Sequence, residues 1–222
     1  MIDPLYFDVF IHSLWMAGIT TVICLLLGYP FAWFVSRLSK YWQPLLMLML
    51  ILPFWTNSLV RTYALKLLFA NNGLINKLLL SIIIIDTPID ILYTQGAVIA
   101  GLTYLLFPFM VLPLYAVFSD LCNDRLLASQ DLGASESMMV RTVLIPVIFP
   151  AVMSGWLLAF TLSLDDVVVS TFVTGPSYEI LPLRIYSMVR VGLKPEVNAI
   201  GTILLVASLI LVVISQLLLR RR

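Results

Sequence analysis

The stretch that decides the fold is ILYTQGAVIAGLTYLLFPFMVLPLYAVFS, which runs from Ile91 to Ser119 without a charged residue. A bilayer core about 30 Å thick needs roughly 20 apolar residues of helix, so this stretch is long enough to cross a membrane. Within hydrocarbon every backbone N–H and C=O has to be satisfied inside the segment, and a helix does this. The stretch therefore predicts a transmembrane helix.

The composition of the whole chain agrees with a membrane protein. Of its 222 residues 61% are hydrophobic and only 11% are charged, which is too apolar for a soluble domain. The net charge of +1 lacks the basic excess of a nucleic-acid binder, so that class is excluded. The two cysteines, Cys24 and Cys122, lie far apart and suit free thiols. The N-terminus lacks the basic region of a cleavable signal peptide, so we expect the first apolar segment to be retained.

Further long apolar runs extend this pattern along the chain. We predict one all-α, multi-pass membrane domain over residues 1–222, a kinked bundle of about five transmembrane helices. The predicted spans are residues 12–36, 43–69, 94–118, 142–173 and 197–219. Residues 70–93 and 175–196 are predicted as outer re-entrant or interfacial segments, and residues 120–141 as a cytoplasmic loop. Prolines within the runs, such as Pro53 and Pro108, each remove a helix hydrogen bond and predict kinks.

Loop charges indicate the orientation of the chain. Arg220, Arg221 and Arg222 favour a cytoplasmic C-terminus, since basic residues gather on the cytoplasmic side of membrane proteins. Five spans then place the acidic N-terminus outside. We expect localisation in the bacterial inner (plasma) membrane.

Catalysis by this chain is not expected. The sequence has no convincing nucleophile and base pair, no phosphate-cradling glycine loop and no metal-ligand cluster. His12 stands alone near the start of a span and is interpreted as interfacial. We expect no catalytic residue, no metal and no cofactor in the chain.

The polar segment between the third and fourth predicted spans suggests a contact surface. Residues Ala128 to Asp131 are compatible with a helix, Gly133 breaks it, and Ala134-Ser135-Glu136 can cap and open the next helix. From the residues alone, this segment is either an ordinary loop or a surface that docks into another protein.

The segment ASQDLGAS, followed by Ile145-Pro146, resembles the EAA motif of ABC-importer permeases. Ala128 and Gly133 match the motif's second position and its glycine, whereas Leu127 and Ser129 depart from its glutamate and second alanine. The resemblance implies that the loop is a coupling helix that docks on an ATPase. The residues that it implies for this contact are Ala128, Ser129, Asp131, Gly133, Ala134 and Glu136.

The rest of the chain resembles the spermidine/putrescine branch of this family. The stretch from FTLSLDDVVVS to AIGTILLVASLI is similar to the C-type permease, and DPLYFDVFIHSL, GYPFAWF, LPFWTNSLVRTYALK and LLFPFMVLPLY are similar to the B-type permease. The resemblance implies a type I ABC-importer permease fold that lacks the first helix of the family. It also implies partners: an ABC ATPase that binds ATP and Mg, a second permease, a periplasmic polyamine-binding protein and a polyamine substrate.

Two adjacent carboxylates, Asp165 and Asp166, interrupt the fourth predicted span. Intramembrane acids are functional candidates because burying them costs a few kcal/mol. A path for polycations needs acidic groups and aromatic faces. On a helix the two side chains would point about 100° apart, so we expect one to face the path and the other to bind a backbone amide or an arginine. The candidate pathway residues are Asp165, Asp166, Trp55, Asn57, Arg61, Tyr63, Trp156 and Phe160.

Each of these residues also has a purely structural interpretation. Asp165 and Asp166 could cap a broken helix before Val167 or pair with Arg61. Asn57 and Arg61 could reach the interface from the outer end of a span. The aromatic side chains are more often belt or core residues.

The sequence predicts the permease subunit of an importer that moves spermidine and putrescine inward with ATP hydrolysed elsewhere. One alternative is a secondary carrier or channel for cations without an ATPase. A hybrid permease that inserts but does not assemble is the other.

Overall fold

The computed structural model describes residues 4–82, 87–120, 135–175 and 181–191, and in the C-terminal part residues 201–202, 205–206, 209–210 and 213. All regular elements among these residues are helices, without a strand. The predicted all-helical fold is therefore confirmed.

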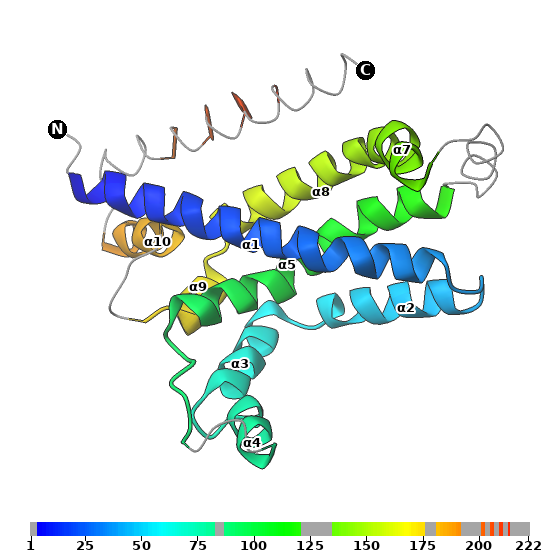
Figure 1. Cartoon of the computed structure of the whole chain (residues 1–222). Coiled ribbons are helices and arrows are strands. Elements are labelled where there is room, and N and C mark those ends of the chain that lie inside the picture. The colour runs from blue at the N-terminus through cyan, green and yellow to red at the C-terminus, as the bar shows by residue number, and fades with distance from the viewer. Residues whose placement is uncertain are drawn as a thin grey trace.

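Three long helices form the body of the molecule (Figure 1): α1 (Pro4–Ser36), α5 (Gln95–Asp120) and α8 (Ile145–Asp165). The charge-free run of the sequence becomes α5, which packs against both of the others. Leu106, Met110 and Leu114 of α5 are fully buried. α5 therefore lies between α1 and α8, and its buried face forms the centre of the core.

Small residues let these three helices approach closely around Met110. A Cβ added to Gly28 of α1 would lie 3.1 Å from Met110 Cγ, and one added to Gly155 of α8 would lie 2.9 Å from Met110 Sδ and 3.3 Å from its carbonyl oxygen. Close helix contact at small residues is typical of membrane bundles, because dispersion contacts replace the hydrophobic effect there. One methionine is thus enclosed from two sides.

Proline shapes the start of α8. The short helix α7 (Glu136–Met139) leads into a π-helical turn, η2 (Val140–Leu144), and the backbone N–H of Ile145 bonds to Val140 O, five residues back. Pro146 has no N–H, and its ring would clash with the carbonyl of Thr142 in an α-helix. The wider π turn removes this conflict.

Gln43 closes the corner between α1 and the next helix, α2 (Trp42–Ile51). Its side-chain amide donates to Ser36 O at 3.1 Å and Leu38 O at 2.8 Å, and its oxygen accepts from Tyr115 Oη at 3.1 Å. Carbonyls at a helix end have no partner within the helix, so this one side chain satisfies the end of α1 and ties it to α5.

The second predicted span is not one straight helix. After α2, a 3₁₀ turn η1 (Leu52–Trp55) contains Pro53, and α3 (Ser58–Phe69) follows at Asn57, whose Oδ1 accepts from Leu59 N at 2.9 Å. The two halves, Trp42–Trp55 and Ser58–Ser81, are bent by 99°. Proline disfavours the helix before it, and the Asn57 cap starts a new helix in another direction.

An arm of α3 and α4 (Leu74–Ser81) projects from the bundle (Figure 1). Asn76 is fully buried; its Nδ2 donates to Ile89 O at 2.9 Å, and its Oδ1 accepts from Ile89 N at 3.0 Å. Asn71 adds a bond from Nδ2 to Asp90 Oδ1 at 2.6 Å. The extended segment before α5 is therefore fastened to the arm.

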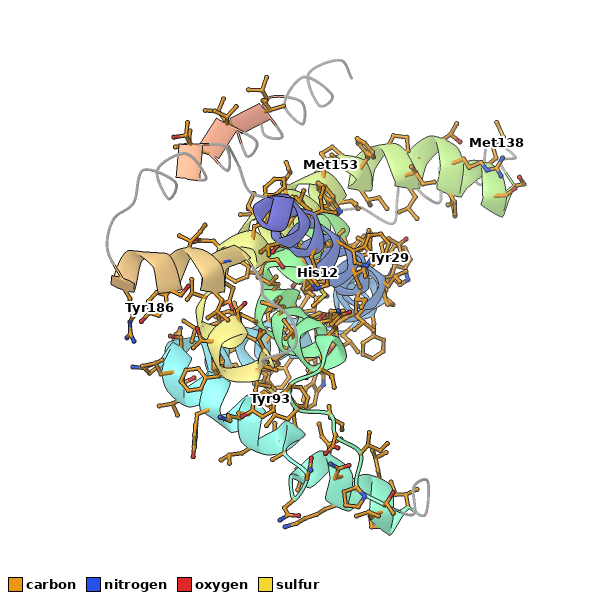
Figure 2. The ribbon with its side chains drawn as sticks, turned by 90° about the vertical axis from the view of Figure 1, so that its left-hand side faces the viewer. His12, Tyr29, Tyr93, Met138, Met153 and Tyr186 are labelled. Atoms are coloured by element: carbon orange, nitrogen blue, oxygen red, sulfur yellow. The ribbon has the colours of Figure 1, made fainter. Side chains whose placement is uncertain are left out.

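The chain that enters α5 also lies against the chain that leaves α9 (Val168–Val173). Tyr93 has a positive φ of 67°, and its carbonyl oxygen would lie 2.6 Å from a Cβ on Gly175. Figure 2 shows Tyr93 beside α9 and the beginning of α5. Only glycine fits at position 175, because any side chain would meet this carbonyl.

Three described helices are long and apolar enough to cross a membrane: Val9–Ser36, Gln95–Asp120 and Ser137–Asp165. The bent pair makes a fourth if it counts as one span. The predicted interfacial segment contains the helix α10 (Leu181–Val191). Most of the predicted span 197–219 lies outside the described residues, although the seven that are described there are helical.

Candidate functional site

The fourth predicted span breaks at the two carboxylates. α8 ends at Asp165, and Asp166 has an extended backbone with φ −74° and ψ 107°. Asp166 Oδ2 then accepts from Val169 N at 2.9 Å and Ser170 N at 3.3 Å, at the start of α9. Asp166 is thus a helix cap, one of the structural roles that the sequence left open.

This break corrects one expectation. The 100° separation of the two side chains assumed a continuous helix, and the helix is not continuous. Asp165 is exposed and Asp166 is half-buried, and both line one pocket of about 360 Å³. Their charges repel each other. The helix break therefore lets two consecutive carboxylates face the same space.

Arg61 reaches this pocket because α3 packs on α5 and α9. Leu65, one turn after Arg61, is buried, and its Cδ1 would lie 4.0 Å from a Cβ on Gly101 of α5. Val169 of α9 approaches the same point to 3.0 Å. Residues i and i+4 lie on one face of a helix, so the packing of Leu65 turns Arg61 toward the carboxylates.

Arg61 has partners of its own within the pocket. Its guanidinium carbon lies 4.7 Å from the centroid of the Phe54 ring, and Nη1 donates to Pro53 O at 3.3 Å. Electrostatic attraction acts between Arg61 and Asp166, but no ion pair within 4.0 Å joins them in the described part of the chain. Arg61 therefore faces the carboxylates without being locked to either.

Aromatic rings complete the pocket. Phe54 and Phe109 contact each other edge to face, with their centroids 5.6 Å apart and their planes at 84°. The remaining lining is aliphatic, from Leu105, Leu106, Leu162, Val167 and Val168. Carboxylates beside aromatic faces can bind an organic cation, by charge on one side and by cation–π contact on the other.

Sequence reasoning missed Phe54 and Phe109. Both lie next to prolines in apolar runs, where they resemble ordinary core residues. One signal was available for Phe54, which lies seven residues before Arg61, a separation that two turns of helix would bridge. The chain bends by 99° between these two residues and does not continue as one helix, but the Phe54 ring still contacts the Arg61 guanidinium.

Five other predicted pathway residues do not line this pocket. Trp55 is 81% exposed and Tyr63 is 53% exposed, and the side chain of Asn57 caps α3. Trp156 and Phe160 of α8 stack on each other at 5.0 Å, with planes 7° apart. Their pathway role stays a prediction, and the pocket itself brings together only Arg61, Asp165 and Asp166 of the predicted set.

The predicted ATPase contact lies almost entirely outside the described residues. Ala128, Ser129, Asp131, Gly133 and Ala134 belong to the segment that is not described, and Glu136 begins α7. Ser135 Oγ accepts from Met138 N at 3.4 Å, so the predicted cap of this helix is confirmed. Among the described residues, no group of three or more His, Cys, Asp and Glu side chains could hold a metal ion.

A family model described as the binding-protein-dependent transport system inner membrane component matches residues 20–222. This match covers most of the chain. The chain therefore belongs to that family of transport permeases.

Curated relatives of both predicted types are similar to the chain. It is 50% identical over 158 residues to the spermidine/putrescine transport system permease protein PotB of Escherichia coli K12, covering 71% of this chain and 58% of the relative. It is 58% identical over 113 residues to PotC of the same strain, covering 51% of this chain and 43% of the relative. The predicted resemblance to both permeases is confirmed, and the matches span about half the length of these relatives.

Solved structures show the same fold. A chain of a bacterial ABC transporter involved in the import of the acidic polysaccharide alginate superposes with a TM-score of 0.75 at 15% identity, covering 99% of this chain and 80% of the other. A chain of an amino acid ABC transporter gives a TM-score of 0.62 at 19% identity, covering 99% and 94%. The predicted fold of an ABC-importer permease is confirmed.

Proposed function

We propose that this chain is a transmembrane permease subunit of an ATP-binding-cassette importer and that it moves polyamines, spermidine and putrescine, inward across the membrane. A separate subunit hydrolyses the ATP, and this chain carries no catalytic residue or cofactor of its own. The proposal rests on family membership, on the similarity to PotB and PotC, and on the chemistry of the pocket.

The observation that carries the substrate class is the pocket at the end of α8. Asp165 and Asp166 supply two negative charges, and Phe54 and Phe109 supply apolar faces beside them. A polyamine alternates ammonium groups with short methylene chains, so it can place charge against the carboxylates and carbon against the rings. The opening at the broken helix provides both surfaces within one space.

The proposal also assigns the partners and the orientation. The ATPase engages the coupling loop of Ala128 to Glu136, a second permease completes the path, and a periplasmic binding protein delivers the polyamine from outside. The N-terminus lies outside and the C-terminus in the cytoplasm of a bacterium. A structure of the alginate ABC transporter in complex with a ligand-bound periplasmic protein supports an arrangement of this kind.

Uptake of radiolabelled spermidine and putrescine tests the proposal. Cells that lack their own polyamine permeases receive this chain with an ABC ATPase, a polyamine-binding protein and a second permease. We expect ATPase-dependent uptake that falls at least about tenfold in Asp165→Asn or Asp166→Asn, because one of two charges that attract the cation is lost. Asp90→Asn is the matched control, since Asp90 lies on the extended segment before α5, outside the pocket, and an amide oxygen can still accept from Asn71.

Each other outcome contradicts a defined part of the proposal. Uptake that persists without the ATPase would instead indicate a secondary carrier. Membrane insertion without uptake, with every second permease tried, would indicate a chain that does not assemble. Equal losses in Asp166→Asn and Asp90→Asn would remove the pocket from the pathway.

A further inference from the structure

The pocket already contains a positive charge on its aromatic face. The Arg61 guanidinium carbon lies 4.7 Å from the Phe54 centroid, within the range of a cation–π contact. One face of a ring holds one cation at a time. A substrate ammonium that approaches Phe54 on this face has to displace Arg61.

The hold on Arg61 is weak enough for displacement. It consists of the ring contact and one hydrogen bond to Pro53 O at 3.3 Å, slightly longer than a usual N–H···O bond. Asp166 directs Oδ2 to the backbone of α9, and Asp165 makes no hydrogen bond among the described residues. The flexible arginine side chain can therefore move away without breaking an ion pair.

The charge of the pocket depends on where Arg61 lies. Its lining contains two carboxylates and one guanidinium, so the formal charge is −1 with Arg61 in place and −2 when Arg61 has left. If a single ammonium group replaces the guanidinium, the formal charge of the pocket returns to −1, the same value as with Arg61 in place. Replacing the guanidinium by a molecule with two ammonium groups neutralises the pocket.

We propose that Arg61 is a built-in competitor of the substrate that makes the pocket select cations with more than one positive charge. This inference rests on the proposed function and adds a specificity-determining residue to it. Arg61 lowers the apparent affinity for every cation by the fraction of time it occupies the ring. A diamine recovers that loss through its second charge, whereas a monoamine does not.

Equilibrium binding of radiolabelled putrescine tests the inference. The assembly of this chain with its ATPase and second permease is placed in lipid nanodiscs without the binding protein, so that only the membrane path is probed. The competitor is n-butylamine, which has the same four-carbon chain and one ammonium group. In the unchanged protein, we expect a hundredfold excess of n-butylamine to displace little putrescine.

In Arg61→Gln, putrescine is expected to bind roughly tenfold more tightly, as suits the loss of one partly screened unit charge, and n-butylamine to displace it. Arg61→Lys keeps the charge and is expected to keep the exclusion of n-butylamine. Lys66→Gln is the matched control. Lys66 lies on the same helix over the ring of Tyr93, at 5.7 Å, and does not line the pocket.

Arg61→His gives the same comparison within one protein, which matters if Arg61→Gln does not assemble. Its imidazole is charged well below a pH of about 6.5 and neutral well above it. We expect n-butylamine to be excluded at the lower pH and to compete at the higher pH.

The inference is overturned if Arg61→Gln still excludes n-butylamine, or if Arg61→His excludes it equally at both pH values. Putrescine binding in the same experiments would still uphold the proposed function. Absence of putrescine binding and uptake in the unchanged protein overturns both.

Discussion

The bundle and the helix break hold their helices together in different ways. Around Met110, α1, α5 and α8 meet through close packing, with glycines where a side chain would collide. Around the pocket, Asn57 and Asp166 start α3 and α9 by hydrogen bonds to backbone N–H groups, and Arg61 binds Pro53 O. The junction around Met110 is held by close packing, and the junction at the pocket is held by hydrogen bonds at helix ends.

The difference indicates which region can carry charge. A packed junction tolerates no added atoms, and a buried charge there would have no partner. A capped break needs polar side chains for its own geometry, and each cap contributes only about 1 kcal/mol. Asp166 therefore lies where the fold already requires an acceptor, and Asp165 beside it makes no hydrogen bond among the described residues.

Gly155→Leu should have the largest effect, because the new side chain would collide with the backbone and Sδ of Met110. Overpacking of a core costs about 1–3 kcal/mol or more. We expect a lower melting temperature and a loss of monodisperse protein in detergent, read by fluorescence-detected size exclusion. Gly18→Leu on α1 is the control, since nothing lies within 4 Å of a Cβ there. Equal effects of both changes would show that close packing against Met110 is not the cause of the loss.

Two substitutions at Asp166 separate its structural role as a helix cap from its proposed role in polyamine transport. Asp166→Ala removes the acceptor for Val169 N and Ser170 N and should lower the free energy of unfolding by about 1 kcal/mol. Asp166→Asn keeps an acceptor and should retain stability while it lowers polyamine uptake. The measurement pairs thermal unfolding with uptake at equal protein amounts. If both variants lose stability equally, the cap does not depend on the side-chain oxygen.

Asn57→Ala should have the smallest effect. The lost bond to Leu59 N is exposed, so we expect about 0.5–1 kcal/mol, confined to the first turn of α3. Hydrogen exchange of residues 58–62 is expected to accelerate by several-fold, with Asn57→Asp close to the unchanged protein. Faster exchange throughout α5 as well would contradict a local cap.

The sequence predicts the long helices well because the absence of charge is a local property. The segments around α1, α5 and α8 are apolar for long enough that only a helix in a membrane satisfies their backbone. A kink at Pro53 was predicted, but the 99° bend that follows it was not, since apolar residues continue past it and the direction of α3 is set by packing of Leu65 on Gly101.

Part of the pocket was predicted because charged residues, like long apolar runs, can be recognised locally in the sequence. Asp165, Asp166 and Arg61 are conspicuous as charges among apolar residues. Phe54 and Phe109 are not, and only the fold shows that they meet. Trp55 and Tyr63 were chosen for their residue type, and the helix turns them toward the exterior of the chain.

Asn76 has a consequence for which substitutions the arm accepts. The Asn76 side-chain amide bonds to both the backbone N–H and the backbone C=O of Ile89. Neither bond involves the Ile89 side chain. Position 89 is therefore recognised by its backbone, and the Ile89 side chain is 47% exposed. Related chains should vary freely at this position, apart from proline, which has no N–H to donate.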